Sequence, residues 1–200
     1  MNQAQTGTVG SLIEQLRSSD RTKRLSAASQ LADLEGEAKT AIPILKSWIG
    51  SEDRYSHVTA LGTMMWIDRS EADALLPLLI EALEMDGLEQ WQAILQIQSL
   101  GELAIKAVPV LTRLVEEGDT TVCWQASDAL YQITGDDSSV VKVGQRLLND
   151  PDELVRVVAV EHLMQLHKSV PTLQKVAVED ESGLVRNRAR QALKEIEGRG

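Results

Sequence analysis

The stretch DELVRVVAVEHLMQL, residues 152–166, determines the expected fold, because its pattern returns along the whole chain. Its apolar residues Ala159, Leu163 and Leu166 recur at helical spacing and would form one buried stripe. Asp152 stands just ahead of this stripe, where a carboxylate can accept hydrogen bonds from the free N–H groups of a first helical turn. The stretch is therefore predicted to be an amphipathic helix that begins at an aspartate cap.

The same arrangement returns every 33 residues. The cap position is occupied in turn by Asp20, Asp53, Asp86, Asp119 and Asp152. A sixth copy, SGLVRNRARQALKEI at 182–196, follows a three-residue deletion and has a serine at the cap position. In the third copy, Glu89 would complete a capping box with Asp86. A metal-binding ladder of these aspartates is disfavoured, because neighbouring carboxylates would lie one helix-packing distance apart, about 8–10 Å.

A second amphipathic segment precedes each of these helices. Prolines are expected in the first turn of four of these preceding helices, where the missing N–H costs nothing: Pro43, Pro77, Pro109 and Pro171. The sequence thus predicts an all-α protein of six helix pairs, about twelve helices, with no strand pattern. We expect a disordered lead-in over residues 1–8 and a single domain over 9–200. The predicted repeats cover approximately 9–36, 39–69, 72–102, 105–135, 138–168 and 169–197.

The repeated unit resembles the HEAT repeat, in the bacterial form related to phycobilin-lyase repeats. The similarity covers about residues 9–197 and is fullest at 152–166 and 182–196. It departs at the family's arginine, which His57, Gln90 and Cys123 replace in the middle copies. The resemblance implies a right-handed α-solenoid whose second helices line the concave side, and a role in binding other macromolecules.

Composition narrows the possible functions. The net charge of −10 argues against general nucleic-acid binding, because phosphate contacts need a basic surface. The single cysteine, Cys123, excludes an internal disulfide and a cysteine zinc cluster. No apolar run approaches the roughly 20 residues of a membrane span, and no export signal is evident. We therefore expect a cytoplasmic protein without membrane partner, metal or cofactor.

The face opposite the buried stripe carries the candidate binding residues. It lies two residues before the periodic alanine, and again two and five residues after it. The family pattern would usually place charged residues in the first of these rows, but here five successive copies are apolar. An exposed apolar strip on a soluble protein usually marks a binding surface, and tryptophan is a frequent hot spot. The predicted contacts are Leu25, Val58, Met65, Trp91, Leu95, Trp124, Asp128, Tyr131, Val157 and Met164.

This face predicts a non-enzymatic scaffold that binds a protein or peptide segment, as a monomer or a weak homodimer. Strong curvature would instead bury these side chains in an ordinary core, and Trp91 in particular would suit a core. A Trp-lined groove could alternatively hold a tetrapyrrole, as the phycobilin-lyase resemblance implies. Trp124 beside Asp128 also resembles the base-removing site of the alkylpurine DNA glycosylases built from HEAT-like repeats. This groove, however, lacks the basic residues with which those enzymes hold DNA. Trp48 is expected in the core, and Trp66 is not assigned.

Overall fold

The computed structural model describes residues 3–166 and 169–198, and all of its regular structure is helical. The contacts divide the chain into two compact units, Met1–Ala107 and Val108–Gly200. No strand occurs in the described residues, in agreement with the predicted all-α class. Residues 1–2 of the predicted lead-in and residues 167–168 of the fifth predicted repeat lie outside the described residues.

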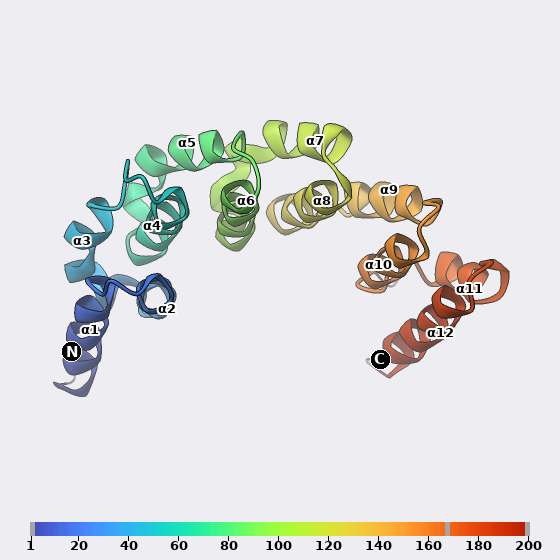
Figure 1. The fold of residues 1–200 in the computed structure, drawn as a ribbon, viewed down its shortest axis with the longest axis horizontal. Helices are drawn as coiled ribbons and strands as arrows, with labels where there is room; N and C mark the ends of the chain where they lie inside the picture. The colour runs from blue at the N-terminus through green and yellow to red at the C-terminus, as the bar shows by residue number, and fades with distance from the viewer. Residues whose placement is uncertain (1–2, 167–168, 199–200) are drawn as a thin grey trace. The chain divides into compact units, whose positions relative to one another are not determined.

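The first unit is a two-layer stack of helix pairs. Its elements are α1 (Gln3–Leu16), α2 (Arg21–Asp33), η1 (Glu35–Ala41), α3 (Ile42–Lys46), α4 (Arg54–Ile67), η2 (Arg69–Glu71), α5 (Ala72–Ala82), α6 (Leu88–Leu100) and η3 (Gly101–Ala107). The helices α2, α4 and α6 lie side by side in one layer, and α3 and α5 cover α4 from the other (Figure 1). The first helix starts at Gln3, within the segment predicted as a disordered lead-in.

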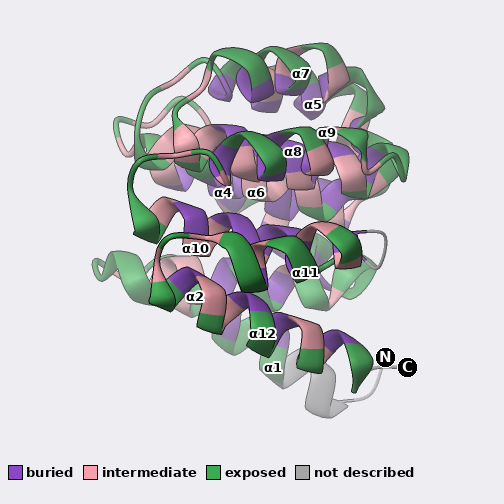
Figure 2. Ribbon diagram, turned by 90° about the vertical axis from the view of Figure 1, so that its right-hand side faces the viewer, coloured by how far each residue is buried: buried purple, intermediate pink, exposed green. Residues whose placement is uncertain are grey.

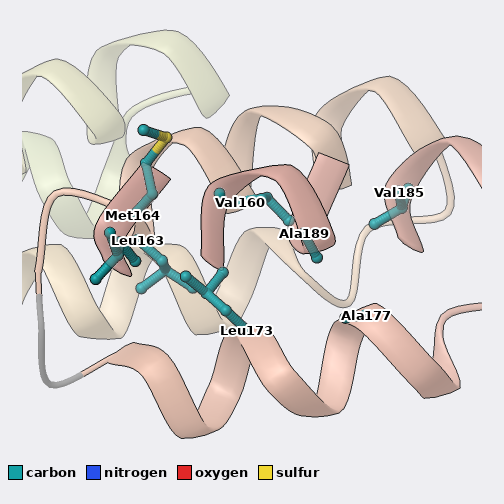
Figure 3. Close-up of a cluster of buried hydrophobic side chains, with 9 residues drawn as sticks. Val160, Leu163, Met164, Leu173, Ala177, Val185 and Ala189 are labelled. Carbon is teal, nitrogen blue, oxygen red and sulfur yellow. The ribbon is translucent and has the colours of Figure 1, made fainter. Parts of the chain in front are cut away.

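The second unit repeats the alternation of covering and inner helices. Its elements are α7 (Val108–Glu117), α8 (Thr120–Thr134), α9 (Ser138–Leu147), α10 (Glu153–Leu163), α11 (Val170–Glu179) and α12 (Gly183–Glu197). Each helix buries the side that faces its neighbours and exposes the other (Figure 2). Figure 3 shows how Leu163 of α10, Leu173 of α11 and Ala189 of α12 meet in a buried apolar cluster.

Most of the predicted caps are present. The side chains of Asp20, Asp53, Asp119 and Asp152 each accept a hydrogen bond from a backbone N–H of the following first turn. Ser182 does the same for α12. These bonds satisfy N–H groups that have no partner within the helix.

Two predicted helix starts are wrong. Asp86 does not cap α6: the cap position belongs to Gly87, which has φ 66° and makes no side-chain cap, so the box with Glu89 does not form. Pro77 lies inside α5, which already begins at Ala72. The Asp68 carboxylate accepts a hydrogen bond from the Ser70 N–H and initiates the helical turn η2. The helix α5 follows this turn directly and therefore starts five residues before Pro77.

Within the described residues, one continuous stretch, Leu88–Glu117, is long and apolar enough to cross a membrane by length and composition alone. The expectation that no stretch approaches this length is therefore wrong. The stretch is not a single straight helix, because Gly101 has φ 54° and ends α6 before η3 and α7 follow. The 13 residues of α6 extend about 20 Å, which is less than the roughly 30 Å of a hydrocarbon core.

A glycine in the second unit marks a close helix contact that can be tested. A Cβ added at Gly144 of α9 would lie 2.5 Å from both Cγ and Cδ2 of Leu163, a fully buried side chain. We expect Gly144→Ala to lower the free energy of unfolding by about 1–3 kcal/mol through overpacking, as measured by urea denaturation. Gly10→Ala is the matched control, since its Cβ meets nothing within 4 Å, and helix propensity predicts a gain of about 0.5–1 kcal/mol. Equal shifts for the two variants would contradict the proposed contact.

Candidate functional site

The first unit contains a groove of about 590 Å³ across α2, α4 and α6. This volume lies within the range of about 300–1,000 Å³ that is typical of ligand-binding clefts. The groove is lined by Leu25, Ser29, Ala32, Asp33, Glu35, Tyr55, Thr59, Thr63, Trp66, Gln92, Leu95, Gln96 and Ser99. Its wall thus combines two aromatic rings, several hydroxyl and amide groups, and two carboxylates.

Helical spacing places these residues on one face of each helix. Tyr55, Thr59, Thr63 and Trp66 follow one another at intervals of four, four and three residues along α4. The two threonines of α4 thus lie in the groove-lining row, whereas its leucine and methionines lie on the other sides of the helix. This row therefore sets two threonines between two aromatic rings along the groove, although most of α4 is buried.

A closed hydrogen-bond network fixes one end of the groove. Tyr55 Oη donates to Gln92 Oε1 at 2.8 Å, and Gln92 Nε2 donates to Thr59 Oγ1 at 3.3 Å. Thr59 Oγ1 in turn donates to the Tyr55 carbonyl oxygen at 2.9 Å. Burial raises the pKa of Tyr55, so the phenol keeps its proton and remains a donor at neutral pH. The guanidinium of Arg21 stacks 4.7 Å from the centre of the Tyr55 ring.

The other end is built around Trp66. Its Nε1 donates to Ser99 Oγ at 3.2 Å, across a separation of 33 residues. Ser99 Oγ donates to the Gln96 carbonyl oxygen at 2.8 Å. Arg69 lies 5.5 Å from the centre of the Trp66 ring. Both aromatic rings of the groove are thus held in place and already have a cation on one side.

Gln96 differs from these residues because its side-chain amide has no hydrogen bond within the described part of the chain. The side chain crosses α4 at Gly62: a Cβ at that position would lie 1.7 Å from Gln96 Oε1. Only glycine leaves this space free. The result is a half-buried amide on the groove floor, with a donor and an acceptor that have no partner in the described residues.

The structure places the predicted contact residues of the first unit in different environments. Leu25 and Leu95 line the groove, and Trp91 is exposed on α6, so it is not a core residue. Val58 and Met65 were predicted on the open face, and this is wrong, since both are fully buried. The reason is that α4 packs against α2, α3, α5 and α6, which buries most of the helix and leaves Tyr55 and Trp66 half-buried beside the groove. Trp48 is buried, as expected.

In the second unit, Met164 was likewise predicted to be exposed and is buried. It packs with Leu163 in the cluster of Figure 3, because α12 closes over this end of α10. Val157 is half-buried against the same cluster. Tyr131, Trp124 and Asp128 are all half-buried on α8.

Trp124 and Asp128 belong to a buried polar cluster that the sequence did not reveal. The fully buried ring of His162 meets the Trp124 ring edge-on, with 5.8 Å between the ring centres. His162 Nε2 lies 3.2 Å from Ser127 Oγ, and Nδ1 lies 3.4 Å from Asp128 Oδ1. The 33-residue period was the available signal, since it brings α8 and α10 of successive copies together and thereby places residue 162 near residues 127–128.

The cluster has the residue types of a serine nucleophile with its base, but not the accessibility. Ser127 is fully buried, and its hydroxyl donates to the Trp124 carbonyl oxygen at 2.7 Å. A nucleophile needs room for a substrate carbonyl beside it. In the described residues, moreover, no group of three or more His, Cys, Asp or Glu side chains could hold a metal ion. Cys123 is buried, and burial raises the pKa of its thiol, which disfavours the reactive thiolate.

Burial perturbs the two ionisable groups of this cluster in opposite directions. It lowers the pKa of His162 to about 4, and it raises the pKa of Asp128 to about 6. The Trp124 Nε1 is buried without a hydrogen-bond partner among the described residues. These features identify a buried network whose protonation is coupled to the stability of the fold.

Comparison with known proteins gives no family for this arrangement. No protein-family model matches the chain, and no curated protein matches it either. The function therefore has to be inferred from the groove itself.

Proposed function

We propose that this protein is a non-enzymatic binding module that holds a short extended segment of a partner polypeptide in the groove formed by α2, α4 and α6. The observation that carries the proposal is the Gln96 amide, which offers an unused donor and acceptor on the groove floor. A peptide bond offers the complementary acceptor and donor, so an extended chain can form both hydrogen bonds at once.

The dimensions of the groove support a short segment. The groove-lining row of α4 runs from residue 55 to residue 66, or about 16 Å at 1.5 Å per residue. An extended chain advances about 3.3 Å per residue, so about five residues fit. Leu25 and Leu95 supply apolar contact, while the exposed hydroxyl of Ser29 supplies a further polar contact.

We also propose that the chain is an α-solenoid of HEAT-like repeats. Within the first unit, three side-chain contacts join residues 33 apart: Thr59 with Gln92, Trp66 with Ser99, and Asp73 with Lys106. Such contacts are expected when equivalent positions of successive repeats stack. The proposal of a right-handed superhelix over both units would be tested by a crystal structure of the intact protein, which shows the handedness directly.

The groove proposal is tested by selecting from a phage-displayed library of random dodecapeptides on the immobilised protein. The key variant is Gly62→Ala, whose methyl group would displace the flexible Gln96 side chain from the floor without entering the core. We expect the selected peptides to bind this variant at least tenfold more weakly than the wild type, by fluorescence anisotropy. Gly10→Ala, far from the groove lining, should bind them unchanged.

A second variant guards against a folding defect. Gln96→Leu removes the amide and keeps a similar volume. This variant should no longer bind the selected peptides, while its thermal unfolding should resemble that of the wild type. If no peptide is enriched, or if enriched peptides bind both groove variants as tightly as the wild type, the groove is not the binding site.

A further inference from the structure

Basic side chains beside the groove have ion-pair or aromatic partners, whereas two acidic side chains that line it have none in the described residues. Arg21 lies 3.4 Å from Asp53 and also stacks on Tyr55, and Arg69 stacks on Trp66. These two cations, one at the start of α2 and one in η2, thus have partners. The carboxylates of Asp33, at the end of α2, and Glu35, in η1, line the groove and make no hydrogen bond or ion pair with any described residue.

Backbone geometry increases the negative potential at the part of the groove wall that these two carboxylates form. Asp33 is the last residue of α2, where the helix dipole places partial negative charge on free carbonyl groups. Glu35 lies two residues further on and has φ 45°, the only positive φ of a non-glycine residue in the described chain. Residues other than glycine rarely adopt a positive φ. Here the residue that does so is a glutamate that lines the groove.

Nearby cations do not neutralise these carboxylates. Lys39 lies 2.7 Å from Asp68, and Lys46 lies 3.2 Å from Glu71. The chain as a whole carries a net charge of −10, so its long-range field also favours a cation. The wall made by Asp33 and Glu35 is therefore electrostatically complementary to a positively charged side chain that enters the groove.

We infer that the segment bound in this groove is basic: it places a lysine or arginine side chain against Asp33 and Glu35 while its backbone meets Gln96. This inference rests on the proposed function and specifies the chemistry of the partner. A segment with a glutamate at the same position would face two carboxylates at close range and would be rejected.

The experiment uses a peptide that was selected on the wild-type protein and that no longer binds the Gly62→Ala variant. We expect such peptides to share a lysine or arginine at one position. Replacing that residue by uncharged norleucine should weaken binding to the wild type about three- to tenfold, the range for ion pairs that keep some contact with water. The difference should shrink as the salt concentration rises.

The double variant Asp33→Asn/Glu35→Gln assigns the effect to this wall. It should bind the lysine and norleucine peptides with equal affinity. The control Glu52→Gln/Glu102→Gln removes the same charge from exposed positions outside the groove lining, and it should keep the preference for lysine.

The outcomes separate the two proposals. If peptides bind in the groove but contain no shared basic residue, or if Asp33→Asn/Glu35→Gln keeps the preference for lysine, the basic partner is refuted and the binding groove stands. If the Glu52→Gln/Glu102→Gln control loses the preference equally, the attraction is a general effect of net charge and the wall is not its source. If Gly62→Ala binds as tightly as the wild type, both proposals fail.

Discussion

Replacing Arg156 by alanine is expected to lower the free energy of unfolding of the second unit by about 3–5 kcal/mol. Its side chain is only 6% exposed, and Asp180, its main partner, is 9% exposed. Nε and Nη2 of Arg156 bind the two Asp180 carboxylate oxygens at 3.0 and 3.2 Å, while Nη1 donates to the carbonyl oxygens of Asp150 and Pro151. The guanidinium thus joins the start of α10 to the loop before α12.

The large effect follows from what the substitution leaves behind. Burial alone would raise the pKa of Asp180, but Arg156 and the backbone N–H of Ser182 hold it below its ordinary value. Without Arg156, a buried charge loses its main partner, and the two backbone carbonyls lose their donor. Arg156→Lys should recover only part of the loss, because an ammonium cannot reproduce the two-pronged contact.

Urea denaturation measures the total effect, and hydrogen exchange locates it. Amides of α10 and α12 should lose protection, while those of α2 and α4 should not change. Lys175→Ala is the control, since Lys175 pairs with Glu179 at a side-chain exposure of 71%, and such pairs contribute at most about 1 kcal/mol. A loss below about 1 kcal/mol for Arg156→Ala would show that the buried pair contributes little to stability.

The sequence predicted the parts of this molecule that depend on a single period. The 33-residue step gave the positions of the helices and the caps at Asp20, Asp53, Asp119 and Asp152. These features are local, because a cap depends only on the residues of the following turn. They could therefore be inferred without knowing how the helices pack.

The open face was harder to predict because it depends on packing. Counting from the periodic alanine gave the right face for α2, where Leu25 lines the groove. It failed for α4, whose neighbours cover Val58 and Met65, while the groove is lined by the row that contains Thr59 and Trp66. When a helix is apolar on several sides, its sequence alone does not show which side is buried. The groove could be located only once the helices that pack against α4 were known.

The buried pair of His162 and Asp128 leads to a prediction about acidic pH. The folded state disfavours the protonated form of His162, whose pKa is about 4 instead of its ordinary 6.5. Between these values the unfolded chain binds a proton that the folded chain does not. Stability therefore falls as the pH falls from about 6.5 to 4, by up to about 3 kcal/mol from this group alone.

Asp128 acts in the opposite direction. Its pKa is raised to about 6, above the ordinary 3.8, so the folded state binds a proton first as the pH falls. This contribution increases stability between about pH 6 and pH 4, again by up to about 3 kcal/mol. In the wild-type protein the two contributions nearly cancel, and the pair protects the second unit from the acid sensitivity that a buried histidine would otherwise cause.

Asp128→Asn removes one side of this balance. The variant should lose about 2–3 kcal/mol more stability than the wild type between pH 7 and pH 4, measured by urea denaturation at half-unit intervals of pH. His162→Gln removes the other side and should become more stable, relative to the wild type, over the same range. Taking differences from the wild type cancels the titration of all other carboxylates, which the three proteins share.

Nuclear magnetic resonance of the His162 ring provides the independent measurement: the ring should remain neutral at pH 5. Parallel stability curves for the three proteins, or a ring that is already protonated at pH 6, would show that His162 and Asp128 form an ordinary ion pair.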